Sequence, residues 1–137
     1  MRIFSAVSGY RFLTFIARLL PKRFGNSAFR FFGKLAGRLN KDRRSMVEKH
    51  LRRTKSSDLD GKEMQKSIDE VFASYATYWF QSFRLPGMSA EKILEGFDYE
   101  GKTNLDEALS SEVGPIIVLP HLGGWEWAAF WVTKIRE

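Results

Sequence analysis

The sequence predicts an α/β protein with a mainly α-helical N-terminal part, followed by the first strands of a sheet. Apolar residues recur at helical spacing through most of residues 1–84, which is typical of packed or interfacial helices. The run "PIIVLP" at residues 115–120 is continuous, apolar and bounded by prolines, the pattern of a strand buried on both faces. Two glycines and a further helical pattern follow it, giving the strand–turn–helix order of α/β folds.

The cysteine and histidine content limits the kinds of site that the chain can build. The chain has 137 residues and no cysteine. Disulfides, Cys-ligated zinc and a thiol nucleophile are therefore excluded. The two histidines, His50 and His121, lie far apart along the chain, which argues against a histidine-built metal site. We expect no bound metal ion.

The charge is divided unevenly along the chain. Residues 1–55 hold fifteen Lys and Arg against two acidic residues, a net charge of +13, whereas residues 56–137 hold seven against fourteen, a net charge of −7. This division predicts two domains, 1–55 and 56–137, with different partners. A basic, aromatic-rich segment suits an anionic surface, either phospholipid headgroups or nucleic acid. The aromatics fall on apolar helix faces rather than on exposed stacking platforms, which argues against nucleic acid.

Residues 1–20 predict a helix that lies in or against a surface and is ended by Pro21. Arg11 is at the middle of the stretch, where a bilayer-spanning helix would lose about 2.5–3.5 kcal/mol. The stretch is also barely long enough to span a bilayer, and no small-residue cleavage site follows it. An interfacial helix is therefore favoured over a membrane span or a signal peptide. Its apolar positions are Ile3, Val7, Tyr10, Leu13, Ile16 and Leu20.

Residues 26–39 predict a second amphipathic helix, and a third is expected from Ser45 to Arg53. In the second helix Arg30, Lys34 and Arg38 repeat every four residues, a spacing at which like charges repel by about 0.2–0.5 kcal/mol per pair. This repeat indicates an anionic partner, and two successive basic amphipathic segments favour a membrane interface. A solvated face on a core helix is the alternative. The predicted apolar face comprises Phe24, Ala28, Phe32, Leu35 and Leu39.

A polar loop over residues 54–61 leads into a long predicted helix. Asp60 and Glu63 have the spacing of a capping box, in which each side chain binds the backbone of the other. The helix is expected to run to about Arg84 and to end before Pro86. Its aromatic residues are predicted to be core rather than a cofactor site. The apolar stripe comprises Met64, Ile68, Phe72, Tyr75, Trp79 and Phe83.

The segment before the apolar run predicts three short elements. Ser89 can cap a helix that extends to Leu94. "FDYEG" at residues 97–101 predicts a brief strand or edge segment, and "NLDEALSSE" at residues 104–112 predicts a helix.

His121 is the candidate reactive group, and Glu126 is its candidate partner. On one continuous helix a separation of five residues rotates the two side chains apart by about 140°. Because two glycines intervene, we expect His121 to end the strand and Glu126 to lie in the first turn of the next helix. There the carboxylate could hold one imidazole nitrogen and leave the other free as a base. The spacing is met easily by chance, so a structural loop histidine stays open as an alternative.

The motifs resemble one known family. "HLGGWE" after "PIIVLP" is similar to the H-x4-D/E motif of the bacterial lipid A biosynthesis acyltransferases of lauroyl- and myristoyl-transferring type. Within that family, "YATYWFQSFRLPGMS" (75–89) followed by "FDYEGKTNLDEAL" (97–109) resembles the phosphatidylinositol mannoside acyltransferases of actinobacteria. The resemblance covers residues 45–135, with a looser match in the basic N-terminal helices.

The resemblance implies a glycerol-phosphate-acyltransferase-like α/β fold and transfer of a fatty acyl group from acyl-CoA to a sugar hydroxyl. The implied acceptor is a mannosylated phosphatidylinositol at the cytoplasmic face of the plasma membrane, where the enzyme would be peripheral and would contact anionic phospholipid. His121 would be the general base and Glu126 the acidic partner. Acyl-CoA is a co-substrate, and no metal or bound cofactor is implied. The family usually has Asn where this chain has Gly124, which removes a side-chain hydrogen bond beside the base.

The sequence ends shortly after the motif, at Glu137. The family's later active-site segments lie downstream of it, so we expect this chain to be an N-terminal part and to be inactive alone. Two alternatives remain. One keeps the chemistry with a lipid A precursor or another glycolipid as acceptor. The other is a peripheral membrane-binding helical module without catalysis.

Overall fold

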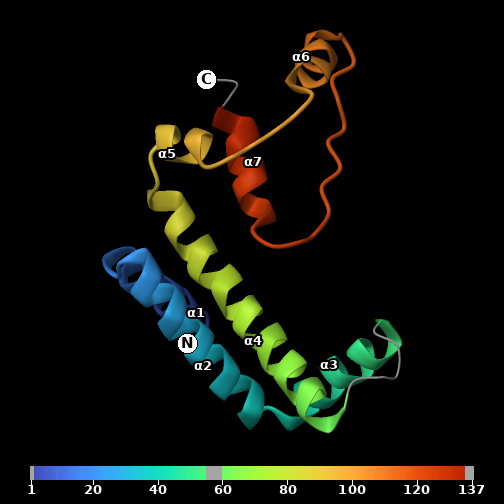
Figure 1. Ribbon diagram of the computed structural model, residues 1–137. Helices are drawn as coiled ribbons and strands as arrows, with labels where there is room; N and C mark the ends of the chain where they lie inside the picture. The colour runs from blue at the N-terminus through green and yellow to red at the C-terminus, as the bar shows by residue number, and fades with distance from the viewer. Residues whose placement is uncertain (1, 55–59, 135–137) are drawn as a thin grey trace. The chain divides into compact units, whose positions relative to one another are not determined.

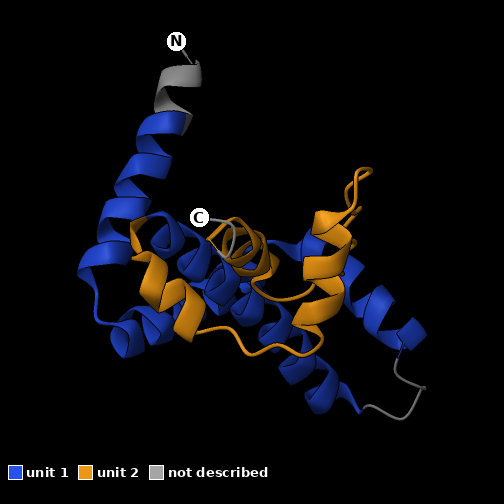
Figure 2. Ribbon diagram, turned by 90° about the horizontal axis from the view of Figure 1, so that it is seen from above, with its two compact units in different colours: residues 1–86 blue, residues 87–137 orange. Residues whose placement is uncertain are grey.

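The structure, a computed structural model, describes residues 2–54 and 60–134, and side chains from residue 7 onward. The chain forms two compact units, residues 1–86 and 87–137 (Figure 2). The first unit therefore includes the long helix that the charge division assigned to a separate domain, 56–137. Parts of the predicted loop (55–59) and the last three residues lie outside the description. The elements are α1 (Arg2–Leu19), α2 (Lys22–Leu39), α3 (Lys41–Thr54), α4 (Gly61–Arg84), the 3-10 turn η1 (Leu85–Gly87), α5 (Ala90–Glu95), α6 (Lys102–Ser110) and α7 (Trp125–Lys134) (Figure 1).

The helices predicted in the first unit are confirmed, although α2 and α3 begin at Lys22 and Lys41 rather than at the predicted residues 26 and 45. Local chemistry explains their ends. Pro21 separates α1 from α2 and has φ −54°, an angle compatible with the start of a helix, so α2 begins directly after it. Asn40 Oδ1 accepts a hydrogen bond from the backbone N–H of Arg43 at 3.1 Å and caps the start of α3. Asp60 Oδ1 accepts from the backbone N–H of Glu63 at 2.7 Å, as the capping box predicts.

Arg84 ties the end of α4 to the end of α1. Its Nη1 donates to the backbone oxygens of Ala17 and Leu20, both at 2.6 Å. The last carbonyls of a helix have no partner within the helix, so the guanidinium satisfies groups that α1 leaves open. The guanidinium carbon of Arg84, Cζ, also lies 5.3 Å from the ring centre of Phe80. The junction between α1 and α4 is thereby held by charge-assisted hydrogen bonds.

The face of α2 that packs on α4 is not its predicted apolar face. α2 lies along α4 (Figure 1) and meets it through residues spaced four apart: Gly25, Phe29, Gly33 and Gly37. The predicted apolar face is largely exposed, with Phe24 at 74% and Leu39 at 78% exposure, so α2 packs on α4 through other residues than those of this face. Glycines bring the two backbones close together, an effect that a count of apolar residues does not detect.

The core of the first unit lies where α1, α2 and α4 meet. Ala17, Phe80 and Phe83 are buried together, and Phe29 packs against them. The rings of Phe29 and Phe80 have centroids 4.9 Å apart, and those of Tyr10 and Phe83 lie 5.1 Å apart edge to face. Aromatic pairs at these separations add to the free energy of burial. The predicted apolar stripe of α4 is thus core at its ends.

The basic stripe of α2 finds its anionic partner within the chain. Arg30 and Lys34 both pair with Glu70 of α4. Two further cations pair with the neighbouring carboxylate of Asp69, namely Arg38 at 2.7 Å and Arg44 at 2.6 Å. The charge repeat therefore aligns α2 and α3 on α4, and the inference from the repeat to an external anionic partner is corrected.

Acid is expected to weaken this alignment. Burial raises the pKa of Asp69, but hydrogen bonds from Arg38 and Arg44 outweigh it, so the pKa lies below the ordinary value. Because the pKa of Asp69 is lower in the folded state, its ionised carboxylate stabilises the folded state fully above the unfolded pKa of about 4. This contribution to the free energy of unfolding is lost as the pH falls through the folded pKa. We expect the thermal midpoint, followed by circular dichroism, to fall steeply below about pH 4.

Two substitutions separate the contribution of the Asp69 carboxylate to stability from that of an exposed ion pair. Asp69→Asn is expected to lower stability at neutral pH by about 1–2 kcal/mol and to flatten the acid dependence. Glu48→Gln removes the exposed pair with Arg52 on α3 and is expected to change stability by under about 0.5 kcal/mol. An acid profile that is the same in Asp69→Asn and in the unmodified chain would contradict this role.

The second unit packs α5 against α7. The Trp127 indole N–H donates to the backbone oxygen of Ile93 at 3.1 Å, and Ser89 Oγ caps α5, as predicted, by accepting from the backbone N–H of Lys92. "FDYEG" does not form the predicted strand. Instead its rings cover Trp131, with centroid distances of 4.8 Å for Phe97 and 4.5 Å for Tyr99.

The predicted buried strand does not form. Residues 115–120 have no regular secondary structure, Ile116 is 93% exposed and Val118 is 86% exposed. Nowhere in residues 2–54 and 60–134 is there a strand, so the helical part of the fold prediction is confirmed while the start of the sheet is not. A strand needs backbone partners from another strand and cover for its faces, and the described residues supply neither.

Candidate active site

His121 lies in the middle of a tight turn. The backbone N–H of Leu122 donates to the oxygen of Pro120 at 2.8 Å, which closes a three-residue turn around the histidine. The imidazole is exposed. Gly123 follows with φ +54°, a left-handed conformation that side-chain-bearing residues rarely adopt. This glycine therefore turns the chain from the extended run into α7.

Glu126 lies in the first turn of α7, as the sequence predicts. The helix opens with a hydrogen bond from the backbone N–H of Trp127 to the oxygen of Gly124 at 2.8 Å. A carboxylate in this turn gains about 0.3–1 kcal/mol from the helix dipole. The placement of both candidate residues relative to the helix start agrees with the prediction, apart from the missing strand before His121. The reach of the carboxylate back to the imidazole stays a prediction.

The structure adds Trp125 to the site. Its ring and the imidazole of His121 have centroids 5.2 Å apart, inclined by 41°. The indole nitrogen is buried and has no hydrogen-bond partner among the described residues. From the sequence, Trp125 was only a member of the motif. Its position directly before Glu126 could have indicated that its ring contacts the turn at His121.

The arrangement suits proton transfer at an exposed position. A neutral imidazole accepts a proton through one nitrogen while the other is a donor. Hence His121 can act as a base on a hydroxyl that approaches from solvent. The indole N–H of Trp125 is buried, so it is not open to a substrate that approaches from solvent.

Two other features are absent from the part of the chain that the structure describes. No group of three or more His, Asp or Glu side chains among residues 2–54 and 60–134 is placed to hold a metal ion. In the same part of the chain, no helix combines the length and the apolar character needed to cross a bilayer.

The chain is similar to known acyltransferases. The family model described as bacterial lipid A biosynthesis acyltransferase matches residues 2–137. A phosphatidylinositol mannoside acyltransferase of Mycolicibacterium smegmatis (strain ATCC 700084 / mc(2)155) is 39% identical over 67 residues, covering 49% of this chain and 22% of the relative. A protein of the same name from Mycobacterium tuberculosis (strain CDC 1551 / Oshkosh) is 38% identical over 63 residues, covering 44% and 20%.

These alignments are partial. They span only about a fifth of the length of the curated relatives. No solved structure matches the chain.

Proposed function

Because the chain belongs to the bacterial lipid A biosynthesis acyltransferase family, we propose that it takes part in transferring a fatty acyl group from acyl-CoA to a sugar hydroxyl of a membrane glycolipid. The proposed acceptor is a mannose of phosphatidylinositol mannoside, which the names of the similar mycobacterial proteins support. The observation that carries the proposal is the family match over residues 2–137, which includes His121 and Glu126.

In the proposed reaction His121 is the general base and Glu126 is its acidic partner. The imidazole takes the proton of the acceptor hydroxyl while the hydroxyl oxygen attacks the thioester carbonyl carbon. The carbon–sulfur bond then breaks, and the CoA thiolate leaves with the proton returned by the imidazolium. These reaction steps balance in atoms and charge without a metal ion or a bound cofactor. The exposure of His121 supports it, because a lipid-borne hydroxyl must reach the base.

The proposed location is the cytoplasmic face of the plasma membrane, with the protein bound peripherally to anionic phospholipid. Exposed apolar side chains of α1 and α2 support this, since a basic helix with an exposed aromatic face binds membrane interfaces. A glycolipid acceptor also remains in the bilayer, so an enzyme acting on it must meet that surface. The exposed residues include Phe12, Phe15, Leu19, Phe24, Phe31, Phe32 and Leu39.

The acceptor is identified by comparing two glycolipids as substrates. The protein expressed from its native reading frame is incubated with radiolabelled palmitoyl-CoA and mixed micelles that contain phosphatidylinositol mannoside or a lipid A precursor. We expect label to enter the mannoside, with release of CoA thiol in equal amount. Label entering only the lipid A precursor would move the proposal to that acceptor. Label in neither, from a protein that still binds vesicles, would favour the non-catalytic membrane module.

A further inference from the structure

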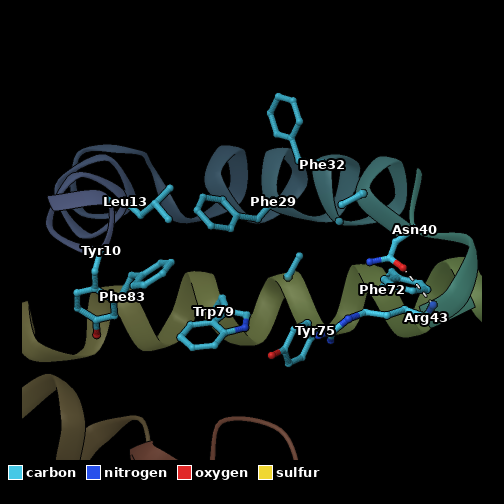
Figure 3. Close-up of a pocket in the computed structure, with 14 residues that line it drawn as sticks. Tyr10, Leu13, Phe29, Phe32, Asn40, Arg43, Phe72, Tyr75, Trp79 and Phe83 are labelled. Carbon is cyan, nitrogen blue, oxygen red and sulfur yellow. Dashed lines mark hydrogen bonds between the residues drawn. The ribbon is translucent and has the colours of Figure 1, made fainter. Parts of the chain in front are cut away.

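An apolar groove runs over the first unit, and none of its lining residues belongs to the His121 motif. Its walls come from α1, α2 and α4, with Asn40 and, from α3, Arg43 at one end, and its volume is about 720 Å³, within the roughly 300–1,000 Å³ range of ligand pockets. In Figure 3 Phe29 extends from α2 toward α4, and Trp79 and Phe83 extend from α4. The groove belongs wholly to the first unit.

The groove explains two aromatic residues that do not behave as core. Sequence periodicity places Tyr75 and Trp79 on the apolar stripe of α4, yet 55% of Tyr75 and 37% of Trp79 are exposed. Their rings pack on each other edge to face with centroids 6.1 Å apart, and both line the groove. Exposed tyrosine and tryptophan rings favour the boundary between membrane and water. The pair is therefore placed for a lipid partner.

The length of the groove matches one leaflet of a bilayer. Along α2 its lining runs from Phe29 to Asn40, which at 1.5 Å per residue is about 16 Å. Half of the hydrocarbon thickness of a bilayer is about 15 Å. One extended acyl chain of a phospholipid is of this length.

One end of the groove carries an unpaired positive charge. Arg43 lines it together with Asn40, and Figure 3 shows the Arg43 side chain reaching toward Tyr75. Arg38 and Arg44 are both paired with Asp69. The Arg43 guanidinium, in contrast, has no carboxylate partner among the described residues. An apolar channel that ends at a free guanidinium is complementary to an acyl chain that ends at a phosphate.

We propose that this groove holds one acyl chain of an anionic phospholipid drawn from the membrane, with its phosphate beside Arg43. The bound lipid would fix the first unit on the bilayer through a defined site rather than through diffuse surface contact. This goes beyond acyl transfer and is independent of it, because the site uses none of the residues of the His121 motif.

The site is tested by photo-cross-linking on vesicles. The probe is a phosphatidylglycerol with a diazirine in the middle of one acyl chain, diluted into phosphatidylcholine vesicles, and the labelled residues are mapped by mass spectrometry. We expect labels on Tyr75 and Trp79. Labels confined to the outer residues Phe24 and Phe31 would overturn the proposal, as would a groove covered by a second copy of the chain and protected from label.

Two variants sharpen the test. Gly9 lines the groove, and no atom lies within 4 Å of a Cβ built there. Gly9→Leu should therefore fold, because leucine also favours the helix, and should narrow the groove at its α1 wall and lower the labelling of Trp79. Arg43→Gln is expected to lower the yield about fivefold, equivalent to about 1 kcal/mol for one basic residue near an anionic leaflet. Lys49→Gln, which removes the same charge elsewhere on α3, should leave the yield unchanged.

The outcomes separate this proposal from the catalytic one. His121→Ala should keep the full labelling pattern, so loss of turnover with intact labelling would concern the proposed function alone. Undiminished labelling of Trp79 in a folded Gly9→Leu variant would overturn the groove site while leaving acyl transfer untouched. Equal labelling by a diazirine-bearing phosphatidylcholine would overturn the role of the Arg43 charge.

Discussion

His121→Ala is expected to lower the rate of acyl transfer by about 10²–10⁴-fold, the usual contribution of a positioned general base. The imidazole is exposed in a three-residue turn and contacts Trp125, so its removal should leave the helices intact. The measurement is the initial rate of label transfer from palmitoyl-CoA to phosphatidylinositol mannoside, in protein expressed from its native reading frame.

The second histidine provides the matched control. His50 is exposed on α3, and His50→Ala is expected to leave the rate unchanged. Added imidazole should restore part of the activity of His121→Ala, because a missing base can be replaced from solution whereas a lost structural contact cannot. Glu126→Gln should slow the reaction less than His121→Ala, since that side chain is proposed to position the base. A rate in His121→Ala equal to that of the unmodified protein would refute the assignment.

Gly33→Ala is expected to destabilise the first unit by about 1–3 kcal/mol, the cost of overpacking a close contact. A Cβ at this position would lie 2.6 Å from Ala76 Cβ and 2.7 Å from the backbone oxygen of Phe72. Because a backbone oxygen cannot rotate aside as a side chain can, α2 and α4 have to separate. The measurement is urea unfolding followed by circular dichroism, and Gly33→Leu should be more destabilising still.

Gly9→Ala is the control for the effect of glycine itself. No atom lies within 4 Å of a Cβ built on Gly9, so alanine there should stabilise the helix by about 0.5–1 kcal/mol. The two substitutions are chemically identical, and opposite signs are expected because only Gly33 faces another backbone. If Gly33→Ala also stabilised the protein, the close packing of α2 on α4 would be wrong.

Several helix ends were predictable because they depend on neighbouring residues. Pro21 follows the end of α1, as expected, and the Asp60–Glu63 pair and Ser89 lie at the predicted helix starts. The placement of Glu126 in the first turn after a glycine bend is equally local. The capping roles of Asp60 and Ser89 can be read from spacing alone, since the partner of each is a backbone N–H three residues away.

The packing of the helices was not predictable in the same way. Apolar periodicity selected Phe24 and Leu39 of α2, but the glycine face packs because it permits the shortest approach to α4. Tyr75 and Trp79 follow the core periodicity of α4, yet they line a groove because α1 and α2 leave that stretch open. Both outcomes depend on the shape of a second helix, which a count of apolar residues does not contain.

By itself the sequence determined the helices, several of their caps and the uneven charge, and it placed His121 before α7 and Glu126 in the first turn of that helix. Each of these features rests on short-range chemistry. Only the tertiary structure decided which face of α2 packs, which acidic residues neutralise its basic stripe and where a groove stays open. It also decided that residues 115–120 lie extended and exposed. The reason is common to all of these: close approach, ion pairing and strand pairing each need a partner that is distant in the chain.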